Sequence, residues 1–347
     1  MSEANLITET ATRIFQDLCT PEVIESAEAG TWPAKLWQTV EETGLTLAGV
    51  DESAGGSGGE IADAMEVIAI AAKFAVPLPI AETFRAAKLL ESVGASVPGG
   101  PMTVAVGEFR LESGTDGLRL RGGAMGVPFA GDCHAVVLAA QQESRWKLCC
   151  VPIELAAVTF DRNMAGEERS RVDIDCALAQ DSVFEFAGDD PDTILHAMGA
   201  LVRSVMMAGA LQAVLELSVQ YALERQQFGR PIAKFQAIQQ QLAVLAGEVA
   251  VCQRAADAVK GHMADLDPLE IGVAKARIGE AVCLATDIAH QVHGAMGYTR
   301  EHALNLRTRR LWCWRDEFGN ETFWQRRLGE AITAMGADNL WGLIASG

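Results

Sequence analysis

The feature that most constrains the fold of this chain is the regular spacing of apolar residues over its C-terminal part. Apolar residues recur there every three or four positions, which places them along one face of a helix. A spacing near 3.5 residues also favours shallow crossing angles between packed helices. We therefore expect residues 189–347 to form an antiparallel bundle of the four-helix type. The three stripes run through Leu201, Val205, Ala208, Leu211, Leu215, Val219 and Ala222; through Phe235, Ile238, Leu242, Leu245, Val249, Cys252, Ala256 and Val259; and through Ile278, Ala281, Ala285, Ile288 and Val292.

The middle of the chain has a different character, with short β-like runs in place of long periodic ones. The change follows the segment PGGP at 98–101. Several such runs separated by short turns predict a small central β-barrel or sandwich over residues 101–188. The runs are TVAV at 103–106, GLRLRG at 117–122, HAVVLAA at 134–140, WKLCCVPI at 146–153 and SVFEF at 182–186.

Residues 1–100 are predicted to be helical. An apolar helical run extends from Ile61 to about Val76, where Pro77 and Pro79 interrupt it. The chain is thus predicted to be α+β and mostly α. Its predicted domains are an N-terminal helical domain over 1–100, a central β-domain over 101–188 and a C-terminal helical bundle over 189–347.

Charge and composition exclude several classes of function. The net charge of −18 repels nucleic-acid phosphates, and no large Lys/Arg cluster offsets it, so no nucleic-acid partner is expected. No apolar run approaches the roughly 20 residues that span a bilayer, and the acidic start MSEANLITET does not resemble a secretory signal. We expect a cytoplasmic protein without membrane insertion. The eight cysteines form no CxxC pair and have no zinc-type spacing with histidines, so no metal site is expected.

Two motifs in the predicted bundle carry most of the chemical information. The first is YALERQQFGRPI at 221–232, followed by Phe235 and Gln236; Arg225 suits the last turn of a helix, and Gly229 ends it. The second is QVHGAMGYT at 291–299, with Glu301 and Arg309 beyond it. Together with LWQTVEETGLTLAGVDESAGGSGG at 36–59, these motifs resemble the acyl-CoA dehydrogenase family. The resemblance touches both ends of the chain and agrees with the predicted order of helices, β-domain and helices.

The resemblance implies a flavoprotein with FAD between the β-domain and the bundle, and with the ADP half of FAD reaching a neighbouring subunit. Arg225 and Gln227 would meet the phosphates or the adenosine, because a guanidinium grips phosphate oxygens with two aligned donors. The segment from Gln291 would approach the ADP moiety across a dimer interface, where glycine allows close backbone approach. The cofactor-binding residues implied are Arg225, Gln227, Phe228, Phe235, Gln236, Gln291, Gly294, Ala295, Gly297, Asn320 and Thr322.

The reaction of this family removes the α-proton of an acyl-CoA thioester while hydride leaves the β-carbon for flavin N5. It needs one carboxylate base in a desolvated pocket. Most members carry a glutamate directly before the glycine that corresponds to Gly319, but here that residue is Phe318. Some relatives instead carry it 26 residues before the arginine of the first motif, where this chain has Gly199. Phe318 and Gly319 are expected to contact the substrate, and Glu317 is the nearest candidate base.

Two segments of the β-domain also depart from the family pattern. The TEPxxGSD type of loop has no counterpart between Val104 and Gly117, and a WITN-like segment is replaced by GVPFAG at 126–131. Both departures fall on the face that the resemblance assigns to the flavin.

Three interpretations remain. The chain is a divergent acyl-CoA dehydrogenase that uses Glu317 as its base, or it is the degenerate partner subunit of a heteromeric bacterial enzyme and completes an FAD site whose base belongs to another polypeptide. Alternatively, the fold serves a flavin-dependent monooxygenase or a non-enzymatic interaction subunit. The expected partners are an acyl-CoA from fatty-acid or steroid side-chain catabolism and an electron acceptor such as electron-transfer flavoprotein. The expected assembly is a homo-oligomer (dimer or tetramer) or a hetero-oligomer with a second acyl-CoA dehydrogenase-like subunit.

Overall fold

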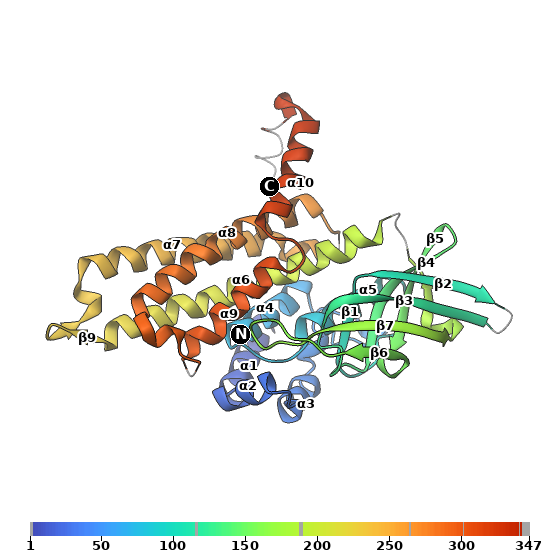
Figure 1. Cartoon of the computed structure of the whole chain (residues 1–347), viewed down its shortest axis with the longest axis horizontal. Coiled ribbons are helices and arrows are strands. Elements are labelled where there is room, and N and C mark those ends of the chain that lie inside the picture. The colour runs from blue at the N-terminus through green and yellow to red at the C-terminus, as the bar shows by residue number, and fades with distance from the viewer. Residues whose placement is uncertain are drawn as a thin grey trace. The chain divides into compact units, whose positions relative to one another are not determined.

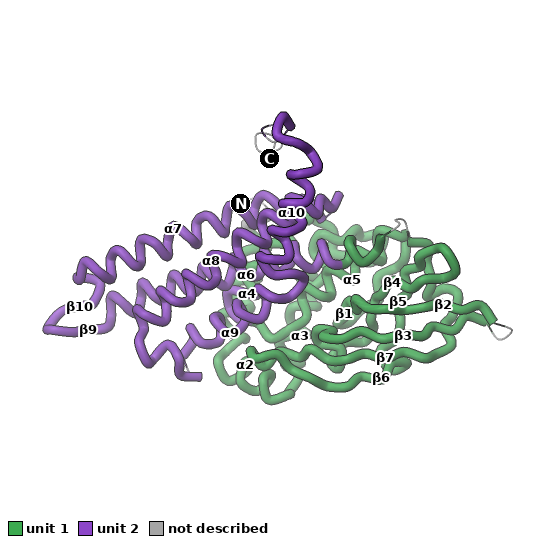
Figure 2. The backbone as a smooth tube through the Cα atoms, turned by 45° about the horizontal axis from the view of Figure 1, so that its top comes forward, with its two compact units in different colours: residues 1–71, 76–195 green, residues 72–75, 196–347 purple. Residues whose placement is uncertain are grey.

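The computed structural model describes residues 3–114, 117–186, 190–263, 265–300, 302–339 and 341. The chain forms two compact units, one of residues 1–71 and 76–195 and the other of residues 72–75 and 196–347 (Figure 2). Along the sequence, a run of helices precedes the strands and another run follows them (Figure 1). The predicted fold class, mostly α with a central sheet, is confirmed. The three-domain division stays a prediction, because the first unit holds both the N-terminal helices and the sheet.

The helices of the first unit are short and are bounded by proline and glycine. Proline suits the first turn of a helix, where its missing N–H is no loss, and Pro21 begins α2 in this way. Gly56 is required for a different reason: a β-carbon built on it would lie 2.2 Å from the carbonyl oxygen of Val50. The helices are α1 (Glu3–Leu18), α2 (Pro21–Glu28), α3 (Ala34–Glu42), α4 (Ile61–Lys73, which ends in the second unit) and α5 (Ile80–Ser92).

The sheet has the strand order β6-β7-β3-β2-β4-β5-β8, and β1 pairs in parallel with β4. Its core is apolar and includes Phe109, Leu120, Val136 and Val172. The five predicted runs correspond to β1, β3, β4, β5 and β8, whereas β2, β6 and β7 were not predicted. The strands are β1 (Met102–Ala105), β2 (Glu108–Gly114), β3 (Gly117–Pro128), β4 (Ala135–Gln142), β5 (Arg145–Pro152), β6 (Ala156–Thr159), β7 (Arg169–Leu178) and β8 (Val183–Glu185).

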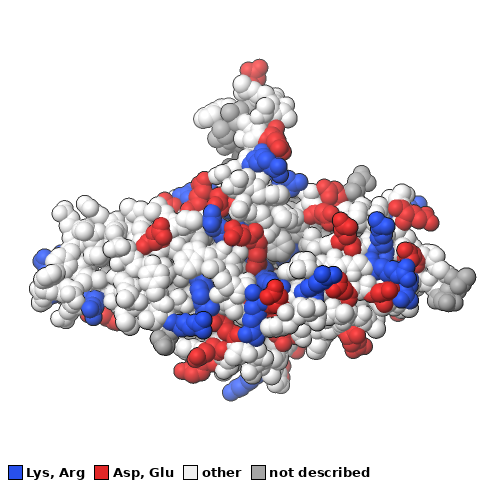
Figure 3. Space-filling model, viewed as in Figure 1, with Lys and Arg blue, Asp and Glu red and all other residues white. Residues whose placement is uncertain are grey.

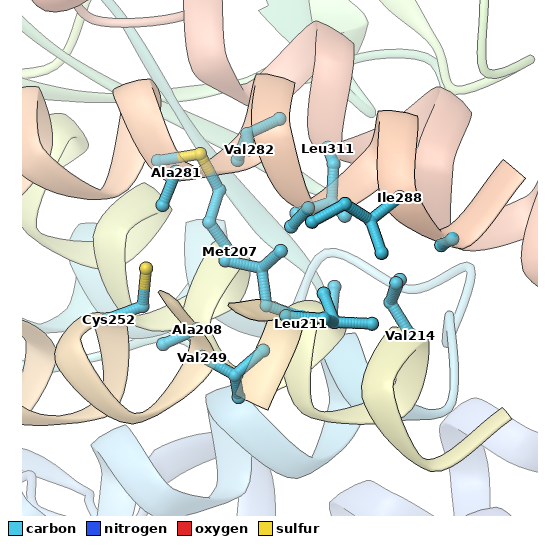
Figure 4. Close-up of a cluster of buried hydrophobic side chains, with 14 of the residues drawn as sticks. Met207, Ala208, Leu211, Val214, Val249, Cys252, Ala281, Val282, Ile288 and Leu311 are labelled. Carbon is cyan, nitrogen blue, oxygen red and sulfur yellow. The ribbon is translucent and has the colours of Figure 1, made fainter. Parts of the chain in front are cut away.

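The second unit is a helical bundle built around one long helix. Figure 4 shows part of its core, in which Met207 and Leu211 of α6 meet Val249 of α7 and Val282 and Ile288 of α8. The predicted stripes are buried along most of their length, although Val219 near the end of the first is exposed. The elements are α6 (Pro191–Glu224, whose first residues belong to the first unit), the hairpin β9 (Gln226–Gln227) and β10 (Arg230–Pro231), α7 (Gln236–Val259), α8 (Pro268–His293), α9 (Ala303–Asp316) and α10 (Glu321–Met335).

Helix α6 is unusually apolar. Among the described residues it alone is long and apolar enough to cross a membrane, but 83% of its most apolar window is buried inside the protein. A helix that is apolar on all sides and covered by neighbours is typical of a protein core.

Two leucines of α6 give a matched test of this packing. Leu211 is fully buried and Leu223 is 55% exposed. Leu211→Ala should lower the free energy of unfolding by about 2–5 kcal/mol, because it removes buried methyl groups and leaves a cavity. Leu223→Ala should change it by less than about 0.5 kcal/mol. Denaturant unfolding of both variants measures the difference, and equal effects would contradict the described core.

Candidate active site

The turn between α9 and α10 contains the residues at which the base was expected. Phe318 has φ +54° and Gly319 has φ +86°, so both backbones are left-handed. This conformation is uncommon for a bulky residue and often marks a functional site. Gly319 is required here, because a β-carbon built on it would lie 2.4 Å from Cδ1 of Phe323. Asn320 begins α10, and its side chain accepts a hydrogen bond from the backbone N–H of Phe323 at 3.1 Å.

The ring of Phe318 lies directly against Gly199 of α6. A β-carbon built on Gly199 would lie 2.3 Å from Cδ1 of Phe318. The carbonyl of Phe318 also accepts a hydrogen bond from Nε1 of the buried Trp324 at 3.0 Å. The two positions at which the family resemblance would place a glutamate are therefore neighbours, and one phenyl ring fills the space between them. Neither residue can accept a proton.

Glu317 is held in an ion pair. Its Oε2 lies 2.6 Å from Nε of Arg203, a residue of α6 that is almost completely buried. The guanidinium carbon of Arg203 is 5.4 Å from the centroid of the Phe318 ring. A buried guanidinium is costly without a counter-charge, so the Glu317 carboxylate neutralises Arg203. The side chain of Glu317 is 20% exposed, and its role as a base stays a prediction.

A buried lysine fixes the same turn from α8. The Nζ of Lys275 donates hydrogen bonds to the carbonyls of Arg315 and Gly319, both at 2.7 Å. Burial lowers the pKa of Lys275 to about 8, an effect that the nearby Glu317 carboxylate opposes. Arg315 itself pairs with Glu321 through two contacts, one of them at 3.0 Å. The turn is therefore held at both ends by buried or half-buried charges.

The hairpin after α6 carries the first set of predicted cofactor residues. Phe228 is 91% exposed with φ +51°, and Gly229 follows with φ +77°, the pattern of a two-residue type I′ turn. The guanidinium of Arg230 lies 4.3 Å from the centroid of Phe235. Arg225 is exposed, and its side chain makes no hydrogen bond or ion pair within the described part of the chain. Two further predicted residues, Gln227 and Gln236, are also exposed.

The second set of predicted cofactor residues follows the end of α8. Gln291, Gly294 and Ala295 are exposed, and Gly294 has φ +61° with no atom within 4 Å of where a β-carbon would stand. Gly297 is buried instead, and a β-carbon on it would lie 3.0 Å from side-chain atoms of His293. Its position indicates packing rather than an open contact.

An aromatic contact links the two chain segments that carry these two sets of predicted cofactor residues. Tyr221, in the last turn of α6, stacks on His293, at the end of α8, with ring centroids 4.5 Å apart. The third set lies apart from this contact, on the α9–α10 turn: Asn320 caps α10 and Thr322 is exposed in its first turn. Glu301 lies outside the described residues.

Sequence reasoning missed Arg203 and Lys275. Both side chains are fully or almost fully buried, and a buried cation needs a partner. That signal is present in the sequence, but the partners, Glu317 and two backbone carbonyls, are far away along the chain.

On the face shown in Figure 3, acidic and basic residues are interspersed without an extended basic patch among the described residues.

Comparison with known proteins decides the family. The model of the acyl-CoA dehydrogenase N-terminal domain matches residues 1–93, and that of the C-terminal domain matches residues 196–328. The chain belongs to the acyl-CoA dehydrogenase family. It is 29% identical over 314 residues to the acyl-CoA dehydrogenase IpdE2 of Mycolicibacterium smegmatis, covering 88% of this chain and 90% of that protein.

Solved acyl-CoA dehydrogenase structures share the fold. The ChsE4-ChsE5 complex from Mycobacterium tuberculosis is similar with a TM-score of 0.84 and 22% identity over 97% of this chain and 99% of the matched one. A glutaryl-coenzyme A dehydrogenase in complex with glutaryl-CoA has a TM-score of 0.84 and 18% identity over 95% of this chain and 94% of the other. At these identities the likeness extends to the fold alone.

The contact between Phe318 and Gly199 can be tested with a double-mutant cycle. Gly199→Ala should destabilise the protein by about 1–3 kcal/mol, because the new methyl group overlaps the ring. In a Phe318→Ala background the same substitution should cost much less. Unfolding of the four proteins measures the coupling, and purely additive effects would contradict the contact.

Lys275→Met should destabilise the protein, because two part-buried backbone carbonyls lose their hydrogen-bond donor, a loss of typically about 1 kcal/mol each. The loss should also depend on pH. The pKa of Lys275 is about 8 in the folded protein and about 10.4 in the unfolded chain. The wild type therefore gains stability relative to the variant as the pH rises from about 8 to 10, by about 1.4 kcal/mol per pH unit. Unfolding at several pH values measures this, with the exposed Lys234→Met as the control for replacing a lysine by methionine.

Proposed function

We propose that this chain acts in acyl-CoA dehydrogenation as the subunit that completes an FAD site and does not supply the catalytic base. The family supports dehydrogenation of an acyl-CoA thioester in general terms. The division of labour between two polypeptides is the proposal. An electron acceptor such as electron-transfer flavoprotein and a cytoplasmic location belong to the same proposal.

The proposal rests on the observation that neither position at which the family resemblance places the base, 199 or 318, holds a proton acceptor. Removal of the α-proton needs a carboxylate that can approach the substrate and change its protonation state. The phenyl ring of Phe318 occupies the space beside Gly199, and the carboxylate of Glu317 is committed to the buried Arg203. Breaking a buried ion pair by removing one partner typically costs about 3–5 kcal/mol, so the contact with Arg203 opposes the release of Glu317. These contacts favour a site without a base of its own.

The residues of the α6–α7 hairpin and the end of α8 fit the ADP half of FAD. The exposed guanidinium of Arg225 has no partner within the described residues, so it is available to pair with a diphosphate. Gly294 leaves open space where any side chain would stand, which allows backbone groups to come close to a ligand. Gln227 and Gln291 add exposed amide groups. When bound, FAD supplies the acceptor for the hydride that leaves the β-carbon.

The relatives are compatible with this proposal. IpdE2 is named an acyl-CoA dehydrogenase, and a structure with the same fold is a complex of two different polypeptides. The high negative charge of this chain also favours a partner that is less acidic than a second copy of itself. A bulky acyl-CoA thioester, such as one derived from a steroid, is the substrate class that we infer for such an assembly.

The proposal is tested by purifying the chain alone and together with the acyl-CoA dehydrogenase-like product of a neighbouring gene. We expect the chain alone to be colourless or inactive and the co-purified complex to be yellow. An acyl-CoA substrate should bleach the flavin of the complex under anaerobic conditions. Bleaching by the chain alone would overturn the proposal in favour of an autonomous enzyme.

Glu317→Gln distinguishes a chain that uses Glu317 as its catalytic base from a chain that supplies no base. Glutamine still accepts a hydrogen bond from Arg203 but cannot take a proton. We expect the complex with this variant to keep its rate of flavin reduction within about two-fold, with Glu321→Gln in the same turn as the matched control. A loss of about 10²–10⁴-fold in the Glu317 variant alone would identify Glu317 as the base. Flavin content and unfolding are measured in parallel, to exclude an effect on folding.

The third interpretation, besides a non-enzymatic interaction subunit, is a flavin-dependent monooxygenase. It predicts oxygen-dependent product formation when reduced flavin is supplied to the complex. The same preparations serve for this measurement.

A further inference from the structure

An aromatic and histidine cluster lies at the end of α8 and includes Tyr298 of the segment that follows this helix. His293 stacks on Tyr221 with an interplanar angle of 27° and meets the ring of His302 edge-on at 5.0 Å. One turn earlier on α8, His290 lies between the rings of Tyr298 and Trp312, at 4.2 Å and 5.7 Å. These contacts tie the last turn of α6 and the first residues of α9 to the end of α8.

His293 is an unexpected residue for this position. It is buried, and its Nδ1 lies 2.8 Å from the carbonyl oxygen of Ala289, so Nδ1 carries the proton and donates. The other nitrogen, Nε2, is buried and makes no well-formed hydrogen bond among the described residues, although the backbone carbonyl of Leu217 faces the ring. A buried polar atom without a partner typically costs about 1–3 kcal/mol, and a phenyl ring in its place would stack without that cost. A phenyl ring could make the same stack, so what the imidazole adds at this position is sensitivity to protonation.

The cluster connects the two chain segments that carry the residues proposed to bind the ADP half of FAD. Arg225 follows Tyr221 by one helical turn, and the backbone N–H of Arg225 donates to the carbonyl of Tyr221 at 2.8 Å. Gln291 and Gly294 flank His293 in the sequence. A shift of the Tyr221–His293 stack would therefore move Arg225 relative to Gly294.

We propose that His293 is a positioning residue that, through its stack on Tyr221, fixes the distance between Arg225 and the Gln291–Gly294 segment and thereby the affinity for the ADP half of FAD. This inference rests on the proposed cofactor role of those residues. His293 does not itself touch the cofactor in this arrangement.

The protonation of the three histidines of the cluster also depends on their burial. Burial lowers the pKa of His293, and it likewise lowers the pKa of His290 and of His302. The groups that face this cluster include the carbonyls of Ala289 and Leu217, the Thr308 hydroxyl, the three imidazoles and the Asp287 carboxylate, which only partly opposes the effect at His290. The folded state thus favours neutral rings, and their contribution is fully present above the unfolded-state pKa of about 6.5. It is lost as the pH falls below that value.

The test uses the co-purified complex and FAD as the probe. We expect His293→Ala and Tyr221→Ala to weaken FAD binding about ten-fold or more at pH 7.5, measured by titration of flavin fluorescence. His293→Phe keeps the stack and should bind FAD within about two-fold of the wild type. Between pH 7 and pH 5 the wild type should lose FAD more steeply than His293→Phe. His262→Ala, a histidine outside the cluster, is the matched control and should behave as the wild type.

The outcomes separate this inference from the proposed function. If Arg225→Gln weakens FAD binding but His293→Ala lowers only the unfolding temperature, the positioning role is wrong and the cofactor assignment stands. If neither variant changes FAD binding, or the wild-type complex holds no FAD, the proposed function fails and this inference fails with it. An acid sensitivity that is unchanged in His293→Phe would also overturn the positioning role.

Discussion

The packing of neighbouring helices around α6 is the interaction on which the second unit depends. Helix α6 is apolar on nearly all sides, so it is stable in water only when α7, α8 and α9 cover it. The same burial makes every polar group on α6 expensive. Arg203 is the main exception in its buried middle, and the α9–α10 turn supplies the Glu317 carboxylate that neutralises it.

Much of the fold could be predicted from periodicity. The stripe of Ile278, Ala281 and Ala285 is fully buried, as its spacing indicated, because a helix buries one face at a fixed period. Strand β7 was missed although Ser170, Val172 and Ile174 alternate correctly, since charged residues between them give the segment a polar appearance. Strand β2 was missed for a similar reason. Short, half-exposed strands derive their stability from pairing with distant strands, and a local pattern records little of it.

The candidate site was predicted in part. Counting along the motif located Phe318 and Gly199 as the positions where a base was expected, but only the folded chain shows that these two residues touch. The ion pair between Arg203 and Glu317 links residues 114 positions apart, so no local pattern could have paired them. The stack of Tyr221 on His293 likewise joins residues that are far apart in the sequence, so no local pattern could have predicted it. The roles of the cofactor residues stay predictions.

The position of Phe318 close to Arg203 limits how a catalytic base could be restored in this turn. Arg203 already has Glu317 as its counter-charge, and its guanidinium lies close to the ring of Phe318. A glutamate placed at 318 would therefore stand beside a carboxylate that already neutralises Arg203. Two carboxylates at such close range titrate as a coupled pair, with the first proton lost at low pH and the second retained. Recovery of a working base would thus require an exchange of residues at 317 and 318 rather than the addition of one carboxylate.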